Sequence, residues 1–236
     1  MIRLYVKSPL LEKQDISLSD VQSHYLQKVM RLKEGDEILL FNGTHGEWLA
    51  KITANLKKST TLLLVSQTRS PQEEGDFWLL FSPLKPKRQE FLEEKATELG
   101  VSRLWPIRCE RASTLKVNFE KMEAHAIEAA EQCKRLTVPT LKPLTPLSDV
   151  LKTWPEDRLL IFGDETLTAP SLGTLAIDAQ QSYAFLVGPE GGFSPQELSV
   201  LRSHPKTQGV TLNTHILRAE TAALVGLSYL QVRRSG

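Results

Sequence analysis

The first third of the chain alternates short apolar runs with turn residues, which predicts a β-rich domain. The exception is a helix predicted over Val21–Leu32, where the apolar residues recur at helical spacing: Val21, Tyr25, Leu26, Val29 and Met30. The predicted strands are Ile2–Lys7, Glu37–Phe41, a run with Trp48, Ala50 and Ile52 inward against Glu47, Leu49 and Lys51, and Thr60–Val65. Short strands at this spacing are typical of a small barrel or sandwich.

After a polar stretch that predicts a linker, Arg69–Asp76, strands alternate with helices. The predicted strands are Phe77–Phe81, Leu104–Ile107, Arg158–Phe162, Tyr183–Val187 and Val210–Leu212. The predicted helices are Arg88–Leu99, ending before Gly100 as a left-handed cap, then a segment from Glu120 to Leu136 and one from Ala219 to Val232. This order is typical of the α/β class, in which helices cover both faces of a parallel sheet. The sequence therefore predicts two domains.

The composition of the chain limits which cellular compartment and which binding partners are expected. The 236 residues include 29 Lys and Arg against 28 Asp and Glu, a formal charge of +1, and 41% are hydrophobic. These fractions are those of an ordinary globular protein, and a local basic stripe would still allow a nucleic-acid partner. Cys109 and Cys133 form no CxxC pair and no apolar run reaches the roughly 20 residues that span a bilayer, so we expect a cytoplasmic protein. The five histidines lack metal-ligand spacing, so we expect no metal site.

The sharpest local motif is Val187–Leu198, VGPEGGFSPQEL, at the end of a predicted strand. The motif predicts the start of a helix, with Ser194 as N-cap, Pro195 at the first helical position and Glu197 completing a capping box. Glycines at the carboxyl end of a strand allow the backbone to approach a ligand, and open α/β sheets bind ligands there. The spacing fits neither the dinucleotide nor the P-loop fingerprint, and the motif is equally compatible with a tight structural turn.

Two further groups of polar residues follow predicted strands. In Leu212–Gly226, His215, Arg218 and Glu220 either line the same crevice or pair with each other and with the start of the last helix. The second group is basic and comprises Lys85, Lys87, Arg88, Arg103, Arg108, Arg111, Lys134 and Arg135. Such residues form either a solvated face or a stripe that contacts phosphates.

Several motifs together resemble one known family. GPEGGFSPQEL, ILRAETA, HYLQKVMRLKEGDEI, KATELGV and EAAEQCKRLTVP are similar to the SPOUT-class methyltransferases of the ribosomal RNA small subunit methyltransferase E family. The resemblance implies a PUA-like, RNA-binding β-barrel over 1–70 and an α/β domain with a trefoil knot over 75–236. It also implies a homodimer that transfers the methyl group of S-adenosyl-L-methionine to N3 of a uridine in 16S ribosomal RNA of the small subunit.

The resemblance also implies roles for particular residues. The implied cofactor-binding residues are Phe162, Gly163, Gly188, Pro189, Glu190, Gly191, Gly192, Leu212, Ile216 and Leu217. The implied catalytic residues are Arg218, with Glu220 or Asp164 as proton acceptor. Candidate RNA contacts are Arg3, Arg31, Lys85, Lys87, Arg88, Arg108, Arg111 and Arg135. Asn213 and His215 depart from the family pattern, so two alternatives stay open: a similar enzyme acting on tRNA, or a non-catalytic RNA-binding protein with a degenerate knot.

Overall fold

The computed structural model describes residues 1–56, 59–72, 74–178 and 180–235, which form two compact units. The first unit comprises Met1–Glu73 with Ala130–Val138, and the second comprises Glu74–Ala129 with Pro139–Gly236. Of the predicted linker, residue 73 lies outside the described residues, and 70–72 and 74–76 form no helix or strand. The inclusion of Ala130–Val138 in the first unit was not predicted from the sequence.

The first unit is built on a five-stranded sheet in the order β1-β3-β4-β5-β2. Its strands are β1 (Arg3–Tyr5), β2 (Asp15–Ser17), β3 (Glu37–Asn42), β4 (Gly46–Leu56) and β5 (Ser59–Arg69). Only β1 and β3 are parallel to each other; the other pairs are antiparallel. Alternate residues such as Leu40, Ala50 and Ile52 fill a core on one face, as the spacing predicted.

Glu47 is buried, although its place in the alternation predicted an outward side chain. It meets Arg3, also buried, whose Nε donates to Glu47 Oε2 at 2.6 Å. The Arg3 Nη atoms donate to the carbonyls of Ala130 and Arg135 at 2.8 and 2.9 Å, which attaches Ala130–Val138 to this sheet. Arg135 is buried as well and donates to Thr137 Oγ1. The expectation that Arg3 and Arg135 contact RNA is therefore wrong, because both guanidinium groups are used inside the unit.

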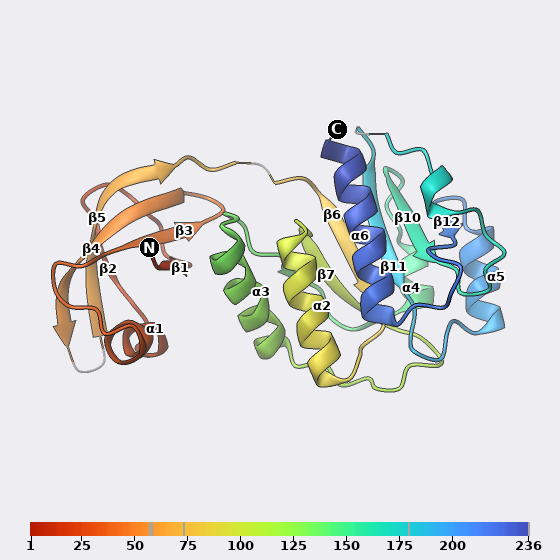
Figure 1. The fold of residues 1–236 in the computed structure, drawn as a ribbon, viewed down its shortest axis with the longest axis horizontal. Helices are drawn as coiled ribbons and strands as arrows, with labels where there is room; N and C mark the ends of the chain where they lie inside the picture. Colours follow the sequence, from red (N-terminus) through yellow and green to blue (C-terminus); the bar gives the residue numbers. More distant parts are fainter. Residues whose placement is uncertain (57–58, 73, 179, 236) are drawn as a thin grey trace. The chain divides into compact units, whose positions relative to one another are not determined.

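The second unit contains a mostly parallel sheet in the order β12-β10-β11-β6-β7-β8, as the strand–helix alternation predicted (Figure 1). Its strands are β6 (Phe77–Phe81), β7 (Arg103–Arg108), β8 (Thr140–Leu141), β10 (Arg158–Gly163), β11 (Ser182–Val187) and β12 (Thr207–Val210), with β9 (Thr145–Pro146) beside β7. Its helices are α2 (Pro86–Glu98), α3 (Phe119–Cys133), α4 (Leu147–Lys152), α5 (Pro195–Ser203) and α6 (Ala219–Ser235). The last strand ends at Val210, two residues earlier than predicted.

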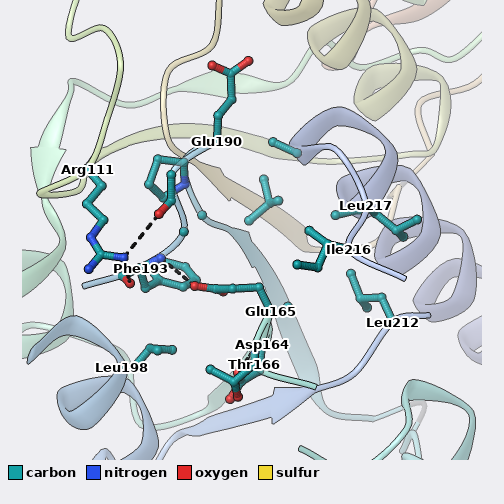
Figure 2. Close-up of a pocket in the computed structure, with 18 of the residues that line it drawn as sticks. Arg111, Asp164, Glu165, Thr166, Glu190, Phe193, Leu198, Leu212, Ile216 and Leu217 are labelled. Carbon is teal, nitrogen blue, oxygen red and sulfur yellow. Dashed lines mark hydrogen bonds between the residues drawn. The ribbon is translucent and has the colours of Figure 1, made fainter. Parts of the chain in front are cut away.

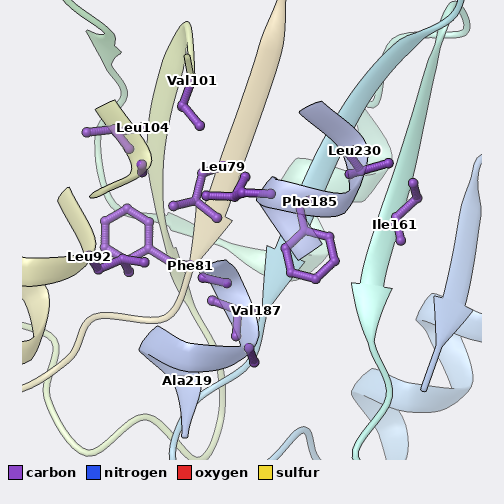
Figure 3. Close-up of a cluster of buried hydrophobic side chains, with 14 of the residues drawn as sticks. Leu79, Phe81, Leu92, Val101, Leu104, Ile161, Phe185, Val187, Ala219 and Leu230 are labelled. Carbon is purple, nitrogen blue, oxygen red and sulfur yellow. The ribbon is translucent and has the colours of Figure 1, made fainter. Parts of the chain in front are cut away.

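Helices cover both faces of this sheet. Phe77, Leu79 and Phe81 of β6 pack with α2 and α6 in one cluster, which Figure 3 shows around Phe185 and Leu230. Trp78 and Leu80 point the other way and pack with α4 and α5. A strand that is buried on both sides must be apolar throughout, and Phe77–Phe81 is apolar for this reason.

The connection from β10 to β11 lies against α6. Gly226 of this helix approaches the ring of Phe185 in β11 so closely that a Cβ would clash. Three residues further along, the hydroxyl of Tyr229 donates to the carbonyl of Leu175, in the connection, at 2.9 Å. The last helix therefore contacts both the sheet and the connection that joins two adjacent parallel strands. The family resemblance implies that these segments form a trefoil knot, an arrangement that general rules of chain connectivity disfavour.

Candidate functional site

A cavity of about 1110 Å³ opens at the carboxyl ends of β10 and β11 (Figure 2). It is lined by the residues that follow these strands and by the segment after β12. Among the residues singled out from the sequence, it collects Gly163, Asp164, Gly188, Pro189, Glu190, Gly191, Gly192, Leu212, His215, Ile216, Leu217, Arg218, Arg88 and Arg111. Ligands of open α/β sheets bind at this edge of the sheet. The cavity is at least as large as a typical small-molecule site.

The glycine-rich turn is held from behind by the carboxylate of Glu165, a residue to which the sequence assigned no individual role. Glu165 Oε1 accepts a hydrogen bond from the backbone N–H of Phe193 at 2.7 Å. Gly192 has a φ of +71°, and a Cβ there would lie 2.6 Å from the same oxygen. Glu165 lies two residues after the end of β10, next to Asp164, and this position is the signal that could have identified it.

The helix after the turn begins as the motif predicted. Ser194 Oγ accepts from the Glu197 N–H at 3.2 Å, and Glu197 Oε2 accepts from the Ser194 N–H at 2.8 Å. Arg111 lies against the turn and donates to the carbonyls of Gly191 and Phe193, each at 3.4 Å. Arg111 thus holds the turn in place. The sequence had suggested Arg111 only as an RNA contact, and this interaction was not predicted.

The opposite wall is apolar. A Cβ on Gly163 would lie 3.1 Å from Leu212 Cδ1, so the absence of a side chain lets Leu212 lie against the end of β10. Leu217 is half-buried in this wall, whereas Ile216 is 75% exposed. Phe162 does not line the cavity: its ring is fully buried and packs edge-on against Phe193. The cofactor role that the resemblance implies for Phe162 is thus not carried by its side chain, because alternation along β10 turns this side chain to the other face of the sheet.

Asp164 is anchored inside the protein and is unsuited to accept a proton from a substrate. Its side chain is 1% exposed and accepts hydrogen bonds from Arg202 at 2.7 and 3.0 Å and from Thr166 Oγ1 at 2.6 Å. Burial alone would raise the pKa of Asp164, but the hydrogen bonds from Thr166 and Arg202 outweigh it and hold the pKa below the ordinary 3.8. The expectation of a catalytic Asp164 is corrected accordingly.

Glu220 lies in a charged group beside the cavity. The guanidinium of Arg88, in the first turn of α2, forms ion pairs with Glu190 and with Glu220, the latter at 3.6 Å from Nε to Oε1. Glu190 Oε2 also accepts from Ser113 Oγ at 3.3 Å. Glu220 Oε2 is buried, and within the described residues no hydrogen-bond donor reaches it. A buried acceptor without a donor is costly unless a ligand supplies one.

The remaining basic candidates differ in their surroundings. Arg218 is exposed on the cavity wall, and no ion pair of the described residues engages it. Lys85, Lys87 and Arg31 are exposed. Arg108 is exposed too, but it lines a separate depression of about 470 Å³ next to α4 and α5.

The described residues contain no group of three or more His, Cys, Asp or Glu side chains arranged to hold a metal ion. Within the same residues, no helix is both long and apolar enough to cross a bilayer. Cys109 is buried, and burial raises the pKa of its thiol well above the usual range. Its thiolate is thus disfavoured, and Cys109 acts as a core residue.

Comparison with known proteins gives consistent matches along the chain. The RNA methyltransferase domain family matches residues 71–231, and the RNA methyltransferase PUA domain matches residues 18–63. The ribosomal RNA small subunit methyltransferase E of Rickettsia conorii is 34% identical over 238 residues, covering 99% of this chain and 96% of that protein.

Two crystal structures with bound cofactor have the same fold. One is a ribosomal RNA small subunit methyltransferase E from Neisseria gonorrhoeae bound to S-adenosyl methionine, with a TM-score of 0.88, 28% identity, and coverage of 98% of this chain and 97% of that one. The other is a putative methyltransferase from Legionella pneumophila in complex with S-adenosylmethionine, with a TM-score of 0.87, 28% identity and the same coverage.

Proposed function

The chain belongs to the RNA methyltransferase family that includes the ribosomal RNA small subunit methyltransferase E proteins, and from this premise we propose that it methylates N3 of a uridine in 16S ribosomal RNA. The family membership that the motifs implied is confirmed, and with it the α/β fold. The enzyme is an S-adenosylmethionine-dependent RNA methyltransferase; the uridine N3 atom, the assembled small subunit, the homodimer and the cytoplasmic location are parts of the proposal.

The cavity that follows β10 and β11 is the observation that carries the proposal. Its glycine-rich turn, Gly188–Gly192, exposes backbone atoms to a ligand, and its far wall is apolar through Leu212 and Leu217. This combination suits a nucleoside, whose base needs an apolar slot and backbone partners. S-adenosylmethionine, when bound, supplies an electrophilic sulfonium methyl. The residues proposed to hold it are Gly163, the Gly188–Gly192 turn, Leu212, Ile216 and Leu217.

Glu220 is proposed as the proton acceptor. The uracil imide N–H has to lose its proton for N3 to attack a methyl group, so a base must lie within hydrogen-bond reach. Glu220 offers a buried carboxylate oxygen without a donor, while Arg88 orients the other oxygen. Asp164 has no comparable free oxygen, because Arg202 and Thr166 occupy its carboxylate.

Arg218 is proposed to stabilise negative charge. Deprotonation at N3 delocalises charge onto the uracil oxygens, and a guanidinium fixed nearby lowers the energy of that state. Arg218 lies on the cavity wall, two residues before Glu220. Arg88 is less suited to this role, because Glu190 and Glu220 already neutralise its charge.

The proposal is tested by cofactor binding and by substrate choice. We expect calorimetry to give saturable binding of S-adenosylmethionine, and we expect methyl transfer to purified small ribosomal subunits in preference to tRNA. Glu220→Gln should retain cofactor binding and lose most of its turnover, because an amide cannot take up the proton. Absence of cofactor binding would favour a non-catalytic RNA-binding protein. Preferential methylation of tRNA would favour a similar enzyme that acts on tRNA.

Glu98→Gln gives a control on the Glu220 assignment. Glu98 is an exposed glutamate that pairs with Lys95 at the end of α2, so the same change of carboxylate to amide there should leave turnover as in the wild type. Wild-type turnover in Glu220→Gln, or an equal loss in Glu98→Gln, would remove Glu220 from the mechanism.

A further inference from the structure

The short helix of the first unit exposes most of its apolar residues. It consists of α1 (Asp20–His24) followed by a π-helical turn, η1 (Tyr25–Val29). Of its apolar residues only Leu26 is buried, while Val21, Tyr25, Val29 and Met30 are 80%, 36%, 59% and 39% exposed. We call these four exposed residues the outer stripe. The helical spacing thus predicts the helix, while most of its apolar residues face outward.

The π-helical turn aligns the outer stripe. The Met30 N–H donates to the Tyr25 carbonyl at 3.0 Å, a step of five residues in place of four. This wider turn places Met30 over Tyr25, which lies one turn above Val21. Single π-helical turns of this kind occur frequently at functional sites.

Polar contacts hold the inner side of the helix on the barrel. Ser23 Oγ accepts from the Thr60 N–H at 2.9 Å, and Gln27 Nε2 donates to the Leu56 carbonyl at 2.9 Å. Gln22 Nε2 donates to the Tyr5 carbonyl at 2.8 Å. These bonds fix the orientation of the helix, and the outer stripe therefore faces away from the sheet. Its apolar surface is available to a partner.

The charges around the outer stripe indicate the chemistry of that partner. His24 and Lys28 flank Tyr25 on the helix, and Arg31 follows directly in a left-handed conformation with a φ of +56°. All three are exposed, and Asp20 is the one acidic residue within the two helical turns, at the N-terminus where it complements the helix dipole. An aromatic ring and aliphatic side chains beside an imidazole and the charged groups of Lys28 and Arg31 suit unstacked bases and their phosphates.

We propose that the outer stripe, with His24, Lys28 and Arg31, docks unstacked nucleotides of the RNA substrate. This inference rests on the proposed function and adds the surface by which the first unit holds single-stranded RNA. A second copy of the chain fits less well. Each large side chain offers at most about 200 Å², so four partly exposed ones fall short of the about 800 Å² per partner of a stable protein interface.

The test uses fluorescence anisotropy with a fluorescein-labelled oligouridylate as the probe. The Tyr25→Ser plus Val29→Ser double variant should bind at least about fivefold more weakly, the lower limit for one base stacked on an aromatic ring. Its salt dependence should match that of the wild type, because no charge is lost. Lys28→Ala should instead reduce the slope of log affinity against log salt by about 0.7 to 1.

Val65→Ser is the matched control, because Val65 is 42% exposed on β5 of the same unit. It should bind the probe as the wild type does, and circular dichroism should show equal melting for all variants. Unchanged affinity of the double variant, or an equal loss in Val65→Ser, would overturn the inference. So would light scattering that shows a wild-type oligomer dissociating in the double variant, since the stripe would then be a protein interface.

The inference and the proposed function fail in different ways. If the wild type neither binds S-adenosylmethionine nor methylates small subunits, the proposed function fails. If the wild type does both and the double variant still binds the probe with wild-type affinity, only the role of the outer stripe is overturned.

Discussion

Gly192 is the residue at which backbone conformation and site geometry depend on each other most closely. Its φ of +71° lies in the left-handed region, which costs a residue with a Cβ about 1–2 kcal/mol. In addition, a Cβ would lie 2.6 Å from Glu165 Oε1, the oxygen that accepts from Phe193. A side chain at this position would therefore strain the turn and displace the carboxylate that holds it.

Gly192→Ala is expected to destabilise the protein by more than about 2 kcal/mol and to weaken S-adenosylmethionine binding. Gly35→Ala is the matched control: its φ is +95°, but nothing lies within 4 Å of its Cβ. Gly35→Ala should lower the free energy of unfolding only by the cost of a left-handed backbone at a residue with a Cβ, about 1–2 kcal/mol. Urea unfolding and calorimetry measure the two effects, and equal losses in both variants would show that the Glu165 contact is unimportant.

Arg218→Ala should reduce turnover about 100-fold or more, the usual effect of removing one charge-stabilising group, while leaving S-adenosylmethionine affinity unchanged. Arg233→Ala, on the same helix α6, is the control; its guanidinium lies near the ring of Tyr229 and should be dispensable for turnover. Initial rates with small subunits and calorimetry separate the two quantities. Retention of wild-type turnover by Arg218→Ala would remove this residue from the mechanism.

Among the elements, the junction between β10 and α5 depends on one ion pair, in which the carboxylate is buried and the guanidinium is partly exposed. Asp164 follows β10 directly, and Arg202 reaches it from the last turn of α5. Thr166 adds a hydrogen bond from the loop between them. The three groups fix the loop that carries Glu165, and so they shape the cavity without taking part in the chemistry.

Asp164→Asn should destabilise the protein at pH 7 by about 1.5–3 kcal/mol, the range for hydrogen bonds to a charged group. Since the folded-state pKa is lowered below 3.8, the carboxylate stabilises the fold above that pH, and this contribution is lost as the pH falls through the folded-state value. The difference in unfolding free energy between variant and wild type should thus shrink in acid.

Asp149→Asn provides the control for this prediction. Asp149 forms an exposed pair with Lys152 on α4, and such surface pairs contribute about 0–1 kcal/mol. Urea unfolding at pH 7 and below 3.8 compares the variants. A loss in Asp164→Asn that is no larger than the control, or that stays constant with pH, would contradict the account.

Elements whose signals are local in the sequence could be predicted. The capping box of Ser194 and Glu197, the C-terminal Gly100 of α2 and the apolar strand Phe77–Phe81 lie within a few residues of their partners. Contacts between distant residues could not be predicted. Arg3 meets Ala130, Asp164 meets Arg202, and Arg88 meets Glu190, and nothing in the spacing of these residues indicates that they pair.

The helix that begins at Asp20 was predicted, but the orientation of its apolar residues was not. Its apolar spacing predicted the element correctly but not the direction of its apolar residues, since Ser23 and Gln27 bind the barrel with polar groups. Periodicity reports which residues share a face, and it does not report whether that face meets the core or a partner.

At the scale of the whole molecule, the two units divide the proposed work. The second holds the cavity, with the glycine-rich turn and Arg218 in its wall and Glu220 beside it, and the first carries the outer stripe. The formal charge of +1 is too small to hold a polyanion, so RNA affinity has to come from local groups of basic residues such as Lys28 and Arg31. We therefore expect cofactor binding to be insensitive to changes in the outer stripe.

Nucleoside analysis of methylated small ribosomal subunits tests the central claim most directly. Purified subunits lacking the modification are incubated with the protein and S-adenosylmethionine, and the digested 16S ribosomal RNA is examined by mass spectrometry against nucleoside standards. The account predicts 3-methyluridine as the new nucleoside, formed by the wild type and almost absent with Glu220→Gln. A methyl group on another base, on a ribose hydroxyl or on tRNA alone would contradict it.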